Sequence, residues 1–196
     1  MTTETAGSYA ARLKIDYPDR ALDKVSTLLR IFYALPIFVV LVALGSGAGG
    51  ALFFPVMLMI VFRQKYPRWW FDFSYQLVRF QTRVTAYLDL MSDEYPSTDE
   101  EQYVHLELDY PDVKTDLNRW LPLVKWFLAI PHYVALFFLI IGAFFAVIAA
   151  WFAILFTGTY PRGIFDYVEG VMRWGLRVEA YAWLLLTDEY PPFSLN

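Results

Sequence analysis

Two long apolar blocks dominate the hydropathy pattern of this chain. Residues 31–62 contain no Asp, Glu, Lys, Arg or His, and within residues 126–161 only His132 belongs to that set. Stretches of this length without charge are hard to fold in water and are typical of segments embedded in lipid. The pattern therefore predicts an integral membrane protein in which both blocks lie in the bilayer.

Each block is about twice as long as one membrane crossing, which needs roughly 20 residues to span a hydrocarbon core of about 30 Å. We therefore predict a transmembrane helical hairpin at about 28–63 and another at about 122–158, which gives four transmembrane helices. The first hairpin would turn in the glycine-rich segment 45–50 and the second at Gly142. Re-entrant hairpins remain an open alternative, because each predicted helix is short for a full crossing.

Shorter patterns flank the apolar blocks. Residues 13–16 and 104–108 alternate apolar and polar side chains, which predicts two short strands. After each block, at about 67–91 and about 161–187, apolar side chains recur at steps of three and four and predict an amphipathic helix. The aromatic and basic side chains of these two helices suit the cytoplasmic membrane interface. Their apolar stripes are equally suited to face lipid or to form a packing seam between the two repeats.

The chain is an internal duplication. Tyr-Pro-Asp, Tyr-Pro-Arg, Phe-Asp, Arg-x-x-x-Arg and Asp-Glu-Tyr-Pro each occur twice, in the same order, with offsets of 93 to 95 residues. The predicted fold class is an all-α integral membrane protein with two tandem repeats, each a short strand, a transmembrane hairpin and a cytoplasmic interfacial helix. The predicted boundaries are an N-terminal tail at 1–11, repeat 1 at 12–97, an acidic linker at 98–103 and repeat 2 at 104–196.

The positions of the basic residues predict an orientation. All 16 Lys and Arg lie before residue 31, between residues 63 and 125, or after residue 161. By the positive-inside rule these regions, with both termini, face the cytoplasm. Each repeat would cross the membrane an even number of times, so both repeats would have the same orientation. We therefore predict a pseudo-two-fold axis along the membrane normal, unlike the inverted repeats of many transporters.

Composition narrows the possible chemistry. Hydrophobic residues make up 58% of the chain and charged residues 18%, and the formal net charge is −4, so there is no basic footprint for nucleic acid. The absence of cysteine excludes disulfides, thiolate metal sites and cysteine nucleophiles. The sequence also lacks the common hydrolase, metalloprotease, phosphate-loop and dinucleotide motifs. We therefore expect no enzymatic activity, no cofactor and no metal.

The amphipathic helices carry the candidate binding residues. In each, two arginines one turn apart are followed one turn later by a tyrosine, and arginine matches the geometry of phosphate and carboxylate groups alike. Binding of lipid headgroups or small anions is one hypothesis for these side chains. The candidates are Arg79, Arg83, Tyr87, Arg173, Arg177 and Tyr181.

Structural ion pairing is the other hypothesis for the paired arginines. Carboxylates on the same two helices are in reach of that role, namely Asp72, Asp166 and Glu169. His132 is a separate case, because a lone histidine in an apolar segment more often hydrogen-bonds a neighbouring helix than binds a ligand.

The repeated motifs also carry a family resemblance. The segments YPRWWFDF and YPRGIFDY, the Arg-x-x-x-Arg-Val-x-Ala-Tyr helix and the closing DEYP resemble the bacterial membrane family called domain of unknown function 4389, in two copies. The resemblance implies a multi-pass protein of the bacterial cytoplasmic (inner) membrane. It implies no activity and assigns no binding residues.

These observations lead to a ranked set of functional hypotheses. The first is a non-enzymatic membrane protein that acts as an accessory, scaffolding or assembly component of a membrane complex. The second is binding of lipid or small anions at the cytoplasmic interface, and the third is a channel or transporter, which the lack of charge inside the blocks disfavours. The expected partners are membrane lipids and other membrane proteins or further copies of the chain, with no nucleic acid.

Overall fold

The computed structural model describes residues 9–196, apart from the side chains of residues 44–52. The fold is mostly helical and contains one two-stranded sheet. In chain order the elements are β1 (Ala11–Ile15), α1 (Lys24–Leu58), the π-helix η1 (Met59–Arg63), α2 (Arg68–Leu88), β2 (Val104–Leu108), the 3-10 helix η2 (Leu121–Leu123), α3 (Lys125–Leu128), α4 (Ile130–Thr157) and α5 (Arg162–Ala182).

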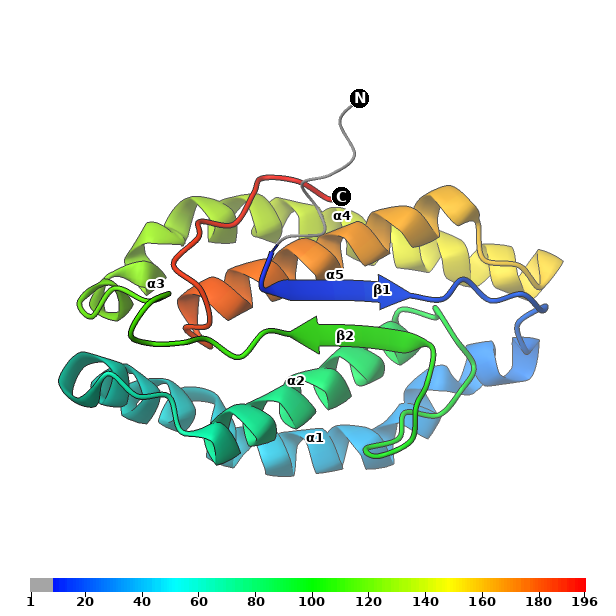
Figure 1. Ribbon diagram of the computed structural model, residues 1–196. Helices are drawn as coiled ribbons and strands as arrows, with labels where there is room; N and C mark the ends of the chain where they lie inside the picture. Colours follow the sequence, from blue (N-terminus) through cyan, green and yellow to red (C-terminus); the bar gives the residue numbers. More distant parts are fainter. Residues whose placement is uncertain (1–8) are drawn as a thin grey trace.

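The elements stack in three layers (Figure 1). The strands form the first layer, α2 and α5 the second, and α1 and α4 the third. β1 packs against α5 and β2 packs against α2, while α1 contacts α2 and α4 contacts α5. Each strand therefore covers the amphipathic helix of the other repeat, and the two repeats interlock.

The sheet joins the two repeats and is centred on one pair of equivalent residues. β1 and β2 are antiparallel, and Leu13 lies opposite Leu106, its counterpart at an offset of 93 residues. Both leucines are buried, whereas Lys14 and His105, which form the next pair, are exposed. The alternation in the sequence therefore reflects one apolar face on the helices and one polar face turned outward.

α1 begins at a side-chain cap. The Asp23 carboxylate accepts hydrogen bonds from the backbone N–H groups of Val25 and Ser26 at 2.7 and 2.9 Å, and so satisfies donors that lack partners within the helix. The helix then continues for 35 residues, about 52 Å at 1.5 Å per residue. Its first half turns a stripe with helical spacing toward the interior, formed by Thr27, Arg30, Ala34 and Ile37.

The structure corrects the predicted hairpins. The backbone of α1 continues as helix through segment 45–50, and α4 continues through Gly142. Among the described residues, two helices are long and apolar enough to cross a membrane, in place of the four predicted. A turn would free backbone groups that an apolar block cannot satisfy, whereas each glycine costs a helix only about 1 kcal/mol. Continuous helices are therefore favoured.

The glycines of α4 serve its end and its packing. Gly158 terminates the helix with a φ of 78°, a left-handed conformation that glycine adopts without strain. Gly142 lies at a close helix contact, where an added Cβ would come within 2.6 Å of the Tyr167 hydroxyl of α5. Gly142 therefore lets α4 and α5 approach each other.

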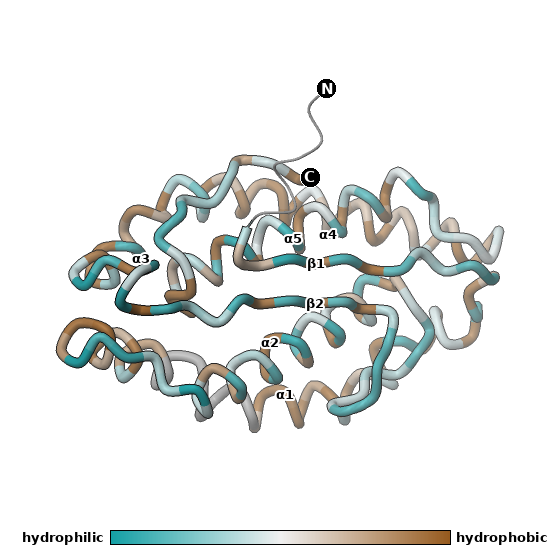
Figure 2. The backbone as a smooth tube through the Cα atoms, viewed as in Figure 1, coloured by the Kyte–Doolittle hydropathy of each residue, from teal (hydrophilic) through white to brown (hydrophobic). Residues whose placement is uncertain are grey.

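The third layer leaves most of its apolar surface uncovered. Within Lys24–Ala43 and Ile130–Thr157, only 22% and 11% of the most apolar window is buried. Ile31 and Phe32 of α1 are 75% and 68% exposed, and Phe138 of α4 is 67% exposed. Figure 2 shows the hydrophobic colour concentrated along α1 and α4. Monomeric soluble proteins rarely expose a patch of this extent, so membrane association is indicated.

Candidate functional site

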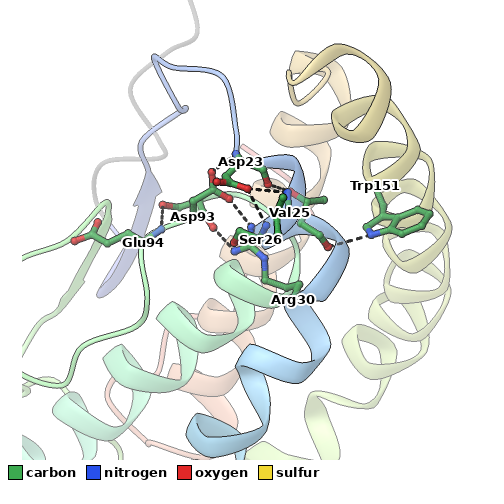
Figure 3. Close-up of polar contacts among 9 residues, drawn as sticks. Asp23, Val25, Ser26, Arg30, Asp93, Glu94 and Trp151 are labelled. Atoms are coloured by element: carbon green, nitrogen blue, oxygen red, sulfur yellow. Dashed lines mark hydrogen bonds and ion pairs between the residues drawn. The ribbon is translucent and has the colours of Figure 1, made fainter.

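The first Asp-Glu-Tyr-Pro motif supplies a buried ion pair. Arg30 of α1 lies 2.6 Å from the Asp93 carboxylate and also donates to the Ser92 carbonyl at 2.6 Å. The second Asp93 oxygen accepts from the backbone N–H of Asp23, which caps α1 (Figure 3). The Arg30 and Asp93 side chains are only 3% and 11% exposed. This group, called clamp 1, ties the start of α1 to the chain beyond α2.

The second motif builds the same arrangement. Lys125 of α3 lies 2.7 Å from the Asp188 carboxylate and donates to the Thr187 carbonyl at 2.7 Å. Asp188 also accepts from the backbone N–H of Asn118. Burial lowers the pKa of Lys125, while the hydrogen bond and the charge of Asp188 act in the opposite direction. This group, called clamp 2, ties the start of the second apolar region to the chain beyond α5.

The tyrosines predicted to bind lipid or anions lie against the clamp cations. The Arg30 guanidinium lies 4.2 Å from the centre of the Tyr87 ring, and the Lys125 ammonium lies 5.2 Å from that of Tyr181. Both rings are 2% exposed. Cations over aromatic faces are stabilised by the ring quadrupole, so both tyrosines form part of the clamps.

The paired arginines hold the segments that follow each Asp-Glu-Tyr-Pro. In repeat 1, Arg83 donates to the Ser97 carbonyl at 2.7 Å and Arg79 to the Thr98 carbonyl at 3.1 Å. Arg83 is 2% exposed. Burial and the neighbouring Arg79 charge lower its pKa. Backbone carbonyls therefore occupy positions that a carboxylate or phosphate was predicted to fill.

Repeat 2 shows the same use of arginine, with an added contact to the sheet. Arg173 donates to the carbonyls of Leu195 at 2.9 Å and Leu13 at 3.0 Å. Arg177 is 2% exposed and donates to the Ser194 carbonyl at 3.5 Å. Burial and the charge of Arg173 lower the pKa of Arg177.

Only one predicted carboxylate meets a paired arginine. Glu169 lies 2.8 Å from Arg173 and accepts from the backbone N–H of Ile15 at 2.9 Å. Asp72 and Asp166 instead pair with Arg68 and Arg162, one turn earlier, at 3.1 and 2.9 Å. The expected partners of these two aspartates were therefore wrong, because a four-residue spacing on one helix surface favours the nearer arginine.

The Tyr-Pro motifs join the two repeats. Tyr17 donates to the Tyr160 carbonyl, and its counterpart Tyr110 donates to the Tyr66 carbonyl, both at 2.5 Å. Arg162 lies 4.5 Å from the Tyr17 ring centre, and Arg68 lies 4.7 Å from that of Tyr110. The repeated Tyr-Pro motifs therefore form equivalent contacts between the two repeats.

His132 is part of a buried aromatic cluster. Its Nδ1 accepts from the Trp174 indole N–H of α5 at 3.0 Å, and its ring stacks on Phe193 with centroids 4.0 Å apart. The hydrogen bond to a neighbouring helix matches the structural interpretation of this residue. In the described part of the chain, no group of three or more His, Cys, Asp or Glu side chains could hold a metal ion.

Sequence reasoning missed two carboxylates in the second layer, Glu179 and Asp89, which lies at the end of α2 and whose pKa burial raises to about 7. Glu179 of α5 lines a hollow of about 80 Å³ beside α2, together with Tyr66, Trp70 and Trp183. Burial raises the pKa of Glu179 to about 7. The signal available in the sequence was a carboxylate at a position where repeat 1 has the neutral Thr85.

Comparison with known protein families identifies the family of this chain. One family model matches it twice, over residues 24–98 and 120–194, and is described as a domain of unknown function (DUF4389). The chain belongs to this family. Each DUF4389 copy includes one apolar helix, one amphipathic helix and the ion pair of one clamp, while β1 and β2 lie ahead of the two matches. No curated protein and no solved structure matches the chain.

Proposed function

We propose that this DUF4389 protein is a non-enzymatic membrane component whose α1–α4 layer contacts lipid and whose sheet layer forms a platform for assembly with other membrane proteins. The observation that carries the proposal is the exposed apolar surface of α1 and α4, of which Phe138, at 67% exposed, is typical. The sheet on the opposite side presents charged pairs such as Arg12 with Glu107, 2.9 Å apart. The clamps hold the apolar regions to the segments beyond α2 and α5, while Arg173 and Glu169 hold β1 against α5.

The exposed charges of the second layer favour an orientation in which α1 and α4 lie in the membrane plane. α2 and α5 carry exposed ion pairs, with the side chains of Arg68 and Asp72 64% and 55% exposed and those of Arg162 and Asp166 similar. α2 packs on α1 and α5 on α4, so if α1 and α4 crossed the bilayer, these charges would enter hydrocarbon at a cost of several kcal/mol. We infer that α1 and α4 are inserted into one leaflet, at the depth of an interfacial helix, about 5 to 10 Å.

A pseudo-two-fold axis along the membrane normal is part of the proposal. It would pass between Leu13 and Leu106, which pair as equivalents in the sheet. The two clamps and the two Tyr-Pro contacts support it, because each contact in one repeat has a counterpart in the other. Such an axis turns both apolar helices toward the same side.

The proposed location is the cytoplasmic face of the bacterial inner membrane, with both termini on the cytoplasmic side. The basic residues of the second layer and the clamps support this side, since cytoplasmic leaflets attract Lys and Arg. Binding of lipid headgroups by the paired arginines ranks lower, because Arg83 and Arg177 are 2% exposed and donate to carbonyls of the chain itself.

Two measurements test the proposal. The protein should remain with vesicles of bacterial phospholipid after a carbonate wash, and replacement of Phe138 and Phe156, which are 67% and 79% exposed, by Gln should release a substantial fraction of it. Extraction in mild detergent should recover the chain in a complex larger than one copy. Recovery only as single chains in every detergent would contradict the assembly role, and full retention of the double variant would contradict the lipid contact.

A further inference from the structure

Two adjoining hollows lie between α2 and α5 on the side of α1. The smaller, of about 80 Å³, is walled by the rings of Phe53, Tyr66, Trp70 and Trp183. The larger, of about 360 Å³, is mainly apolar and reaches α1; its lining includes Leu41, Val78, Met172 and Leu176. Val78, Gln81 and Glu179 line both, so the two hollows adjoin at these side chains, and together they are called the groove.

Glu179 is the charged group of this groove. Among the described residues, the lining of both hollows includes no Lys or Arg, and Tyr66 is the only other ionisable side chain. Burial keeps the Tyr66 pKa well above its ordinary value, so this phenol stays neutral. A carboxylate without a cationic partner in apolar surroundings attracts a cation. The aromatic walls add to this attraction, because ring faces favour ammonium groups.

Trp70, which lines the smaller hollow, carries an unused hydrogen-bond donor. The indole N–H of Trp70 is buried and has no partner in the structure. A buried donor left without an acceptor costs about 1 to 3 kcal/mol. A bound molecule whose oxygen atom accepts from this N–H would remove that cost. The groove thus offers a place for a cation, a donor for a nearby oxygen, and an apolar channel beyond them.

We propose that this groove binds one membrane lipid with an ammonium headgroup. The ammonium lies against Glu179 among the aromatic rings, Trp70 donates to a phosphate or ester oxygen, and one acyl chain follows the larger hollow toward Leu41 of α1. The lack of Lys and Arg in the lining disfavours an anionic headgroup. This inference rests on the proposed lipid contact of α1 and α4, because the acyl chain enters from the lipid-facing side.

Lipid titration of the purified protein in a neutral maltoside detergent tests the proposal. At pH 8, phosphatidylethanolamine should bind saturably and at least about tenfold more tightly than phosphatidylglycerol with the same acyl chains, as expected for a charge-assisted contact. Ethylammonium ion alone should bind far more weakly. Equal affinity for the two lipids, or binding of ethylammonium as tight as that of the lipid, would overturn the proposal.

Variants and pH locate the site. Glu179→Gln should reduce the affinity for phosphatidylethanolamine to that for phosphatidylglycerol, and Trp183→Leu, at an outer wall, should weaken it several-fold. Glu94→Gln, at an exposed carboxylate, is the matched control and should change nothing. Because the Glu179 pKa is about 7 in the free protein, affinity should fall between pH 8 and pH 6 as the carboxylate is protonated.

Lipid binding in the groove can be tested separately from the proposed membrane contact of α1 and α4. Vesicle retention after a carbonate wash is measured on the same Glu179→Gln sample. Unchanged lipid affinity in this variant contradicts the groove site, whatever the retention. Loss of retention in the Phe138 and Phe156 double variant, with lipid selectivity intact in detergent, supports both ideas independently.

Discussion

The two clamps perform one task with different cations. Clamp 1 uses Arg30 and clamp 2 uses Lys125, yet both bind the aspartate of Asp-Glu-Tyr-Pro, the preceding carbonyl and a tyrosine ring. Either a guanidinium or an ammonium group on a long side chain can therefore bind the aspartate at this position. The difference matters when the aspartate is lost, because a buried lysine can release its proton whereas arginine stays charged.

Loss of the aspartate in clamp 1 should have the largest effect. Asp93→Asn leaves the Arg30 guanidinium buried without a counter-charge, and such a change typically costs about 3 to 5 kcal/mol. The free energy of unfolding in detergent, measured by denaturant titration, should fall by that amount at pH 7 and at pH 9.5 alike. A loss below about 1 kcal/mol would mean that the clamp does not stabilise the fold.

The same change in clamp 2 sharpens the comparison. Asp188→Asn should cost about 2 to 4 kcal/mol at pH 7, and the loss should shrink toward pH 9.5. Burial already lowers the pKa of Lys125, and removing Asp188 lowers it further, so the lysine becomes neutral as the pH rises. A pH-independent loss equal to that of Asp93→Asn would show that the two cations behave alike.

The groove is one place where the two repeats differ in charge, since Glu179 corresponds to Thr85. The pKa of Glu179 is about 7 in the folded protein and about 4.5 in the unfolded chain. Folding therefore favours the protonated form, and stability is lost as the pH rises from about 4.5 through about 7. Glu179→Gln should raise the free energy of unfolding by about 1 to 3 kcal/mol at pH 8 and by little at pH 4.5.

A substitution at the Gly142 helix contact should change the free energy of unfolding by an intermediate amount. Gly142→Ala places a Cβ about 2.6 Å from the Tyr167 hydroxyl, and overpacking of this kind costs about 1 to 3 kcal/mol. Combination with Tyr167→Phe should restore part of the loss. Gly175→Ala is the matched control, because nothing lies within 4 Å of the added Cβ, and it should gain up to about 1 kcal/mol from helix propensity.

The exposed ion pairs should matter least. Asp72→Asn and Asp166→Asn remove equivalent pairs on the surfaces of α2 and α5, and each should change stability by less than about 0.5 kcal/mol. Both changes should be equal within error and should diminish in 0.5 M salt. A large loss in one repeat alone would show that the aspartate has a role beyond this pair.

Local patterns in the sequence predict much of this fold. Alternation around Leu13 and Leu106 predicts the strands, and the three-four spacing in residues 67–91 and 161–187 predicts helices where α2 and α5 lie. Duplication also predicts that the repeats share a structure. These features depend on neighbours a few residues apart, and short-range periodicity records such neighbours well.

The sequence patterns do not predict whether a long apolar block turns or which distant residues form hydrogen bonds. Hydropathy and length cannot distinguish two short helices from one long helix, so the glycines at 45–50 suggested a turn that the backbone of α1 does not make. Likewise, Arg83 was expected to meet a charged group, and its acceptor is the Ser97 carbonyl. Backbone carbonyls accept hydrogen bonds at every residue, so no residue type marks the partner in advance.

Single-cysteine labelling tests the in-plane arrangement most directly, and the chain has no native cysteine to interfere. Arg20→Cys and Lys65→Cys flank α1 and η1 at exposed positions, and Ile140→Cys lies near the middle of α4, where Ile140 is 57% exposed. In sealed vesicles, a membrane-impermeant maleimide should reach residues 20 and 65 from the same side and residue 140 from neither side. Labelling of 20 and 65 from opposite sides, or of 140 from the far side, would contradict the account.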